Sequence, residues 1–165
     1  MGTPYSILIN SFLNRVERDI DFFQYLNLSD ADAMALVERR ALAFLGEACG
    51  RILLEAPNRS DFGDRNDLIG EFGFDLTERE KYLVASLMYE RYMSRDIAKL
   101  KALSRDYTST DLRVFSPDEA RKTFKQLYQT VCDENSALLE IYRSTDSTGM
   151  WRPIGYAESD IDASG

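Results

Sequence analysis

The chain has 165 residues, which fits one domain with or without a tail, and 44% hydrophobic residues are sufficient for a packed core. Its 28 acidic and 20 basic residues give a formal net charge of −8, which argues against a protein whose main task is to hold nucleic-acid phosphates. The sequence contains no histidine, so the commonest general base and the imidazole metal ligand are missing, and most hydrolase and zinc-enzyme mechanisms are excluded.

The cysteines and the N-terminal residues bear on cellular location. Cys49 and Cys132 are far apart and form no CxxC unit, so we expect two reduced, buried thiols in place of a disulfide or a metal site. Residues 1–9 show no basic and apolar leader pattern, and the longest apolar run is far short of the roughly 20 residues that span a bilayer. We therefore expect a soluble intracellular protein.

The first predicted helix begins at Thr3 and Pro4, because a cap residue followed by proline is typical of a first helical turn. Apolar residues then recur at steps of three and four, which places them on one stripe of a helix. This stripe consists of Tyr5, Leu8, Ile9, Phe12, Leu13 and Val16. An aromatic connector at residues 22–26 follows.

The second predicted helix runs from Asp30 to about Glu55, after a Ser29 and Asp32 pair that resembles a capping box. Its expected core face again follows steps of three and four. The members of this face are Met34, Val37, Ala41, Phe44, Leu45, Ala48 and Ile52.

Residues 57–75 differ in composition from the helices on either side, with one proline, three glycines and several Asp and Asn residues but no helical period. A long loop in a small domain is usually functional or disordered, and five large apolar residues argue against plain disorder. We predict a protruding, exposed loop or irregular hairpin that contacts a partner. The candidate partner-binding residues in it are Phe62, Leu68, Ile69, Phe72 and Phe74.

The third predicted helix begins at a capping box of Thr77 and Glu80 and runs to about Leu103. A helix of about 26 residues is roughly 39 Å long, more than a small core requires, so we expect part of its surface to face a neighbour. Its expected buried stripe contains Leu83, Leu87, Tyr89 or Glu90, Met93 or Ser94, Ile97, Leu100 and Leu103, broadened by Tyr82, Met88 and Tyr92.

The fourth predicted helix has the strongest start signal in the chain, because Ser116, Pro117 and Glu119 supply a cap, a first-turn proline and an N3 glutamate. It is expected to run to about Arg143. The residues expected to be buried are Ala120, Phe124, Leu127, Tyr128, Val131, Leu138, Ile141 and Tyr142.

Groups that could carry chemistry do not form a recognisable motif. The carboxylates of Asp61, Asp64 and Asp67 lack the glycine and the terminal glutamate of a calcium loop, so solvated loop charges are the favoured interpretation. The acidic residues of the third helix are interpreted as surface charges in helical ion pairs; they are Glu78, Glu80, Glu90 and Asp96. We expect no enzymatic activity, no metal and no cofactor.

The last predicted segment is an extended C-terminal tail at residues 144–165, which ends in acidic residues. It holds the only tryptophan of the chain, and Trp, Tyr and Arg are enriched in binding hot spots. Two interpretations stay open, since the tail either docks on a partner or folds back on its own helices. The candidate partner-binding residues in the tail are Met150, Trp151, Arg152, Ile154 and Tyr156.

Together these elements predict an all-α protein built as a small four-helix bundle. Residues 1–143 would form the helical domain, with residues 57–75 as its protruding loop, and residues 144–165 would form the tail.

The order and spacing of several features between Tyr5 and Arg143 resemble the small helical head-to-tail connector, or adaptor, proteins of tailed bacteriophages and related prophages. These features are helix caps, an apolar run within a long helix and an aromatic connector. They comprise Asp75-Leu76-Thr77, Leu87-Met88-Tyr89, Leu103-Ser104-Arg105-Asp106-Tyr107, Phe115-Ser116-Pro117 and a closing helix that ends at Tyr142. The tail beyond Ser144 is a departure from the family pattern.

The resemblance implies a non-enzymatic structural protein of the virion neck, made in the host cytoplasm. Such a protein would bind the portal protein and a tail or stopper protein, and would self-associate as a ring, with a dodecamer as the expected form. DNA would pass through the ring without sequence-specific binding, and an acidic lumen would let the duplex slide because it repels phosphates. The alternative is a soluble acidic helical regulator that binds a host or phage protein.

Overall fold

The structure, a computed structural model, describes residues 2–16, 30–57, 59–106 and 117–145. Most of these residues are helical, which confirms the predicted all-α class. The helices are α1 (Tyr5–Val16), α2 (Asp30–Glu55), α3 (Glu78–Asp106) and α4 (Pro117–Ser144), and β1 (Arg65–Asn66) and β2 (Glu71–Phe72) form a short antiparallel hairpin between α2 and α3. The helices α2, α3 and α4 begin at the predicted start or directly after the predicted cap residue, and α1 begins one residue after the predicted first-turn Pro4.

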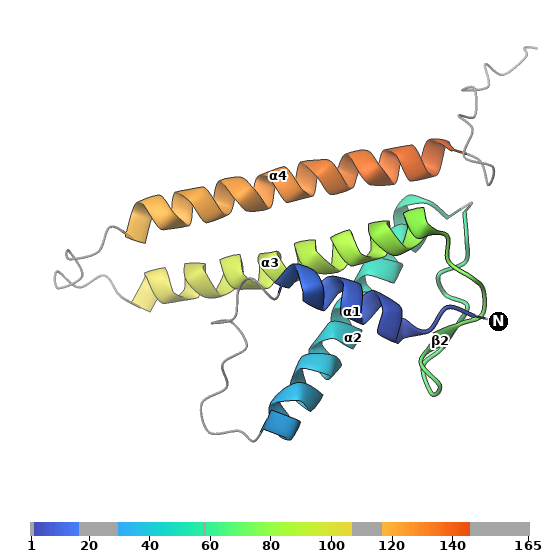
Figure 1. Ribbon diagram of the computed structural model, residues 1–165. Coiled ribbons are helices and arrows are strands. Elements are labelled where there is room, and N and C mark those ends of the chain that lie inside the picture. Colours follow the sequence, from blue (N-terminus) through green and yellow to red (C-terminus); the bar gives the residue numbers. More distant parts are fainter. Residues whose placement is uncertain (1, 17–29, 58, 107–116, 146–165) are drawn as a thin grey trace, which may run out of the picture.

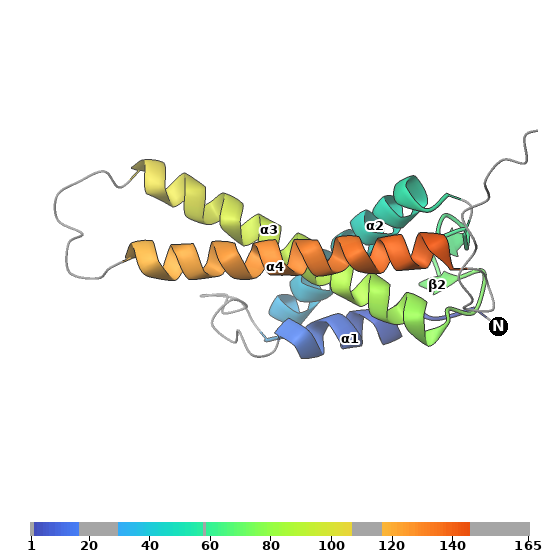
Figure 2. The ribbon, with the colours of Figure 1, turned by 90° about the horizontal axis from the view of Figure 1, so that it is seen from above.

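The long helices α3 and α4 lie side by side, and α1 and α2 pack against α3 (Figure 1). Viewed from above, α4 crosses over α3, and α1 lies to one side of this pair (Figure 2). The helices α1 and α2 cover only the half of α3 that begins at Glu78, so the other half of α3 extends beyond them together with the start of α4.

The core forms where α1, α2 and α3 meet. Phe12, Phe44 and Tyr92, one from each helix, contact one another edge to face with ring centroids 5.8 to 6.4 Å apart. The predicted stripes supply most of the side chains around them. Residues from those stripes that are buried are Tyr5, Leu8, Val16, Ala41, Leu45, Ala48, Ile52, Leu83, Leu87, Met88, Met93 and Tyr142.

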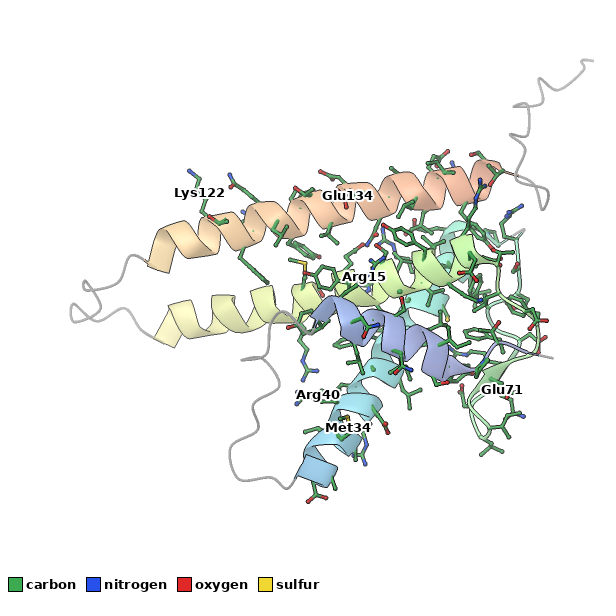
Figure 3. The ribbon with its side chains drawn as sticks, in the orientation of Figure 1. Arg15, Met34, Arg40, Glu71, Lys122 and Glu134 are labelled. Atoms are coloured by element: carbon green, nitrogen blue, oxygen red, sulfur yellow. The ribbon has the colours of Figure 1, made fainter. Side chains whose placement is uncertain are left out.

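Four residues that were expected to be buried are exposed, namely Met34, Tyr82, Leu127 and Ile141. Met34 lies near the start of α2, which extends away from α3 and α4 (Figure 3). The other three lie on the α3–α4 pair. Among the described helices α4 packs mainly on α3, and a helix with one main neighbour buries a narrower stripe than a helix in a closed bundle.

The prediction that the whole segment 57–75 is an exposed loop is wrong for its aromatic residues. Phe62 and Phe72 are fully buried and Phe74 packs against the core. The three rings contact one another with centroids 5.7 to 6.0 Å apart. Phe72 also contacts Tyr5 of α1, so aromatic packing folds the loop onto the helices.

The N-terminal residues act as an additional strand beside β2. The Thr3 N–H donates to the carbonyl of Phe74 (3.1 Å), and the Phe72 N–H donates to the carbonyl of Thr3 (3.0 Å). Glycine is required at position 2, because a Cβ there would overlap the carbonyl oxygen of Phe72. The hairpin is therefore held by backbone hydrogen bonds as well as by aromatic packing.

Candidate partner-binding site

The turn between β1 and β2 presents two adjacent apolar side chains to solvent. Leu68 is 98% exposed and Ile69 is 66% exposed. The Asn66 side-chain oxygen accepts hydrogen bonds from both backbone N–H groups, at 3.1 and 3.4 Å, and its carbonyl accepts the Gly70 N–H at 2.8 Å. Gly70 has φ +72°, which glycine adopts without strain. We call Leu68 and Ile69 the hairpin tip.

Tyr5 of α1 connects the hairpin tip to the helices. Its N–H donates to the Gly70 carbonyl (2.8 Å), and its hydroxyl donates to the Asp67 carboxylate (2.8 Å). Burial and the bond to this carboxylate raise the pKa of the Tyr5 hydroxyl well above its usual range, so the donor stays protonated. The position of the hairpin tip is thus fixed relative to α1.

The surface around the hairpin tip is acidic. The shallow hollow beside it is lined by Asp64, Asp67 and Glu71 and by the cation of Arg65. Apolar side chains inside an acidic rim suit a partner pocket that is apolar at its centre and basic at its edge.

A second concave surface lies beside Tyr82, and we call it the α1–α4 groove. One cavity of about 470 Å³ is lined by Arg15 of α1, Tyr82 and Tyr89 of α3, and Glu134 of α4. Arg15 on α1 and Glu134 on α4 can be followed in Figure 3. A second cavity of about 450 Å³ shares Tyr82 and continues to the end of α4. Its lining includes Arg79, Leu83, Leu138, Ile141, Tyr142 and Thr145.

Glu80 is buried, so its interpretation as a surface charge is wrong. The predicted capping box with Thr77 is present: the Thr77 N–H and hydroxyl donate to one carboxylate oxygen (2.9 and 2.8 Å), and the Glu80 N–H donates to the Thr77 hydroxyl (3.3 Å). The other carboxylate oxygen accepts the hydroxyls of Ser60 (2.6 Å) and Tyr142 (2.8 Å). One carboxylate therefore joins the loop, the start of α3 and the end of α4.

The hydrogen bonds to Glu80 make stability depend on pH. Burial alone would raise the pKa of this carboxyl, but the donors from Ser60, Thr77 and Tyr142 favour the charged form and lower the pKa below 4.5. The folded pKa is below the unfolded one, so this stabilisation is complete above about pH 5 and is lost as the pH falls through the folded pKa.

We expect Glu80→Gln to reduce the free energy of unfolding at pH 7 by about 2 kcal/mol and to flatten its decrease in acid. Urea titrations of both proteins at several pH values between neutral and acidic measure this. Glu78→Gln is the control, because Glu78 is exposed and forms a surface ion pair with Lys81 at 2.8 Å. If the free energy of unfolding of Glu80→Gln decreased as steeply in acid as that of the wild type, Glu80 would not be the source of the pH dependence.

Glu90 is also buried, and its interpretation as a surface charge is likewise wrong. Both of its carboxylate oxygens accept from Arg51 of α2 at 2.7 Å. The Asn135 amide of α4 donates to the same carboxylate (2.8 Å) and to the Ser86 carbonyl (3.1 Å), and the Ser86 hydroxyl donates to the Asn135 oxygen (2.7 Å). These contacts link α2, α3 and α4.

The remaining polar candidates do not converge. Asp67 accepts the Tyr5 hydroxyl, Asp61 accepts the Gly63 N–H (2.8 Å), and no group of three potential metal ligands occurs within the described ranges. Both cysteines are free thiols; Cys49 is buried and Cys132 half-buried. Burial raises the pKa of Cys49 to about 11. No helix in the described part of the chain is long and apolar enough to cross a membrane.

Of the sequence-predicted partner-binding residues, the structure exposes Leu68 and Ile69 and buries Phe62 and Phe72. The tail candidates Met150, Trp151, Arg152, Ile154 and Tyr156 lie outside the described residues. Sequence reasoning missed the α1–α4 groove. Its lining comes from α1, α3 and α4, and the periodicity within each helix does not predict how separate helices are placed relative to one another.

The chain matches no known protein-family model, no curated protein and no solved structure. The resemblance to the connector proteins therefore rests on the sequence features alone.

Proposed function

We propose that the protein is a non-enzymatic structural component of a bacteriophage neck, a head-to-tail connector that forms a ring beneath the portal and docks the tail or the next neck protein. In this proposal residues 1–143 are the adaptor domain, a four-helix bundle, and residues 144–165 are an extended tail. The proposal is supported by the order of helices and caps that resembles this family and by the all-α character of the chain.

The exposure of the hairpin tip is the main structural support for this proposal. Two neighbouring large apolar residues in water are costly for an isolated protein and are typical of a surface that another protein covers. They lie on a turn fixed by Asn66 and Tyr5, so little conformational entropy is lost when a partner binds. A fixed apolar element suits permanent assembly in a particle.

The net charge of −8 is compatible with a channel role. Negative charge at a ring lumen repels DNA phosphates and reduces adhesion of the passing duplex. Asp64, Asp67 and Glu71 line the hollow beside the hairpin tip, which favours a docking partner with a basic rim.

Quantitative mass spectrometry of purified virus particles tests the proposal. A connector is expected at about one copy per portal subunit, as a ring requires. Absence from the particles would overturn the connector proposal and leave the alternative of a soluble helical regulator, for which affinity capture with the full chain is the next experiment.

The double variant Leu68→Asp/Ile69→Asp is expected to abolish attachment of the protein to portal-bearing heads while changing the free energy of unfolding by less than about 0.5 kcal/mol. Attachment is measured by co-sedimentation with purified heads, and stability by urea titration. The control is Leu54→Asp, which makes the same kind of substitution, with one added charge in place of two, at an 84% exposed leucine at the end of α2. Normal attachment of the double variant would remove the hairpin tip from the interface.

A further inference from the structure

The α1–α4 groove has the features of an incompletely filled binding surface. Its two cavities share Tyr82 of α3, whose side chain is exposed. Ile141 on the α4 wall is 43% exposed, and Leu83 and Leu138 line the same cavity. An apolar segment bound here would cover aromatic and aliphatic surface that is now in contact with water.

The groove ends where the described chain ends. Thr145 is the last described residue and lines the cavity that contains Ile141 and Tyr82. The remaining 20 residues of the sequence thus continue from the edge of the groove itself. In the sequence, the large apolar residues of this segment follow within eleven positions of Thr145, at Met150, Trp151, Ile154 and Tyr156.

The length of the chain beyond Thr145 is sufficient to follow the groove. An extended segment covers up to about 3.3 Å per residue, so Trp151 can lie up to about 20 Å from Thr145. The part of α4 that lines the groove runs from Val131 to Thr145, a length of about 21 Å at 1.5 Å per residue. Trp151 can therefore reach the apolar surface on either side of Tyr82.

The groove carries charged side chains of both signs, so its apolar residues and not its net charge favour the tail as occupant. Arg79 lines the cavity at the end of α4, and the Arg15 guanidinium lies 4.6 Å from the centre of the Tyr82 ring. The sequence after the tail's apolar residues carries Glu158, Asp160 and Asp162. The groove also holds the carboxylates of Glu78 and Glu134, and the apolar part of the tail contains one cation, Arg152.

From the position of Thr145, the reach of the chain and the exposed apolar residues of the groove, we propose that the α1–α4 groove binds residues 150–156 of the same chain, with Trp151 against Tyr82 and Ile141. The contact belongs to the free protein and does not depend on the connector role. In a connector it would hold the tail on the helices until a partner with a stronger site displaces it, so the tail would be available only at the assembly point.

Tryptophan fluorescence tests the contact directly, because Trp151 is the only tryptophan. In the full-length protein we expect blue-shifted emission relative to the urea-unfolded chain, and partial protection from acrylamide quenching. Ile141→Asp is expected to shift the emission to the red and to remove the protection. The matched control is Leu127→Asp on the same helix, since Leu127 is 49% exposed and lines neither cavity of the groove.

Several results would overturn the proposal. Trp151 could be as accessible in the native wild-type protein as in urea, or its protection could persist in Ile141→Asp. Protection that disappears on dilution, together with dimers in sedimentation, would assign the groove to a second copy instead. If Ile141→Asp does not fold by circular dichroism, Tyr82→Glu replaces it, because Tyr82 is exposed and a substitution there spares the core. These outcomes are independent of the particle measurement.

Discussion

Phe62→Ala is expected to reduce the free energy of unfolding by about 3–5 kcal/mol, a large part of the 5–15 kcal/mol typical of a domain. Phe62 is completely buried although it lies in a connecting segment. Its ring contacts Phe72 at 6.0 Å, Phe74 at 5.7 Å and Tyr142 of α4 at 6.5 Å between centroids. Truncation leaves a cavity where the loop meets α4, and the surrounding rings cannot all collapse into it.

Urea titration of purified Phe62→Ala measures this loss. The matched control is Leu68→Ala in the same loop, which is expected to change stability by less than about 0.5 kcal/mol because the Leu68 side chain is in water. The two substitutions separate aromatic packing from an effect of loop composition. Equal stability of the two variants would mean that the loop does not pack on the helices in solution.

The different roles of Phe62 and Leu68 show what the sequence could not reveal. Both are large apolar residues among Asp, Asn and Gly, and neither belongs to a helical or strand period. Burial of such a residue depends on the tertiary contacts of the loop, here with Tyr5 and Tyr142, which are distant in sequence. Composition could indicate an ordered loop but not which of its apolar residues face the core.

The helices were predictable because their signals are local. Thr77 and Glu80 form the reciprocal hydrogen bonds of a capping box, and Pro117 begins α4 as a first-turn proline should. The same locality explains the error over Glu80 and Glu90. Charged residues on a helix are usually solvated, and their burial here is compensated by Ser60, Tyr142 and Arg51, which lie 20, 62 and 39 positions away in sequence.

Arg51→Met is expected to reduce the free energy of unfolding by about 3 kcal/mol, because it leaves the buried Glu90 carboxylate without its cation. The Arg51 side chain is 17% exposed and that of Glu90 is 8% exposed, so little solvent is available to replace the lost hydrogen bonds. The Asn135 amide remains as a donor, but a neutral donor compensates less than a guanidinium. Urea titration at pH 7 measures the loss.

Glu55→Gln provides the control, since Glu55 accepts from the same Arg51 guanidinium at 2.7 Å but is 46% exposed. Glu55→Gln is expected to reduce the free energy of unfolding by less than about 0.5 kcal/mol. The double variant Arg51→Met/Glu90→Leu should regain much of the stability lost in Arg51→Met, because it removes both charges and replaces them with apolar volume. A double variant less stable than Arg51→Met would contradict this account.

The same variants show what the buried ion pair contributes beyond stability. The ion pair joins α2 to α3, and Asn135 of α4 donates to Glu90 and shares two further hydrogen bonds with Ser86 of α3. A shift of α4 along α3 would change the α1–α4 groove, because α4 lines both of its cavities. An apolar replacement can restore the free energy of unfolding without restoring this directional contact. If the ion pair sets the helix register, Arg51→Met/Glu90→Leu will be stable, but its Trp151 emission will lie to the red of the wild-type emission. Unchanged emission would show that the Asn135–Ser86 hydrogen bonds and apolar packing are sufficient to position α4.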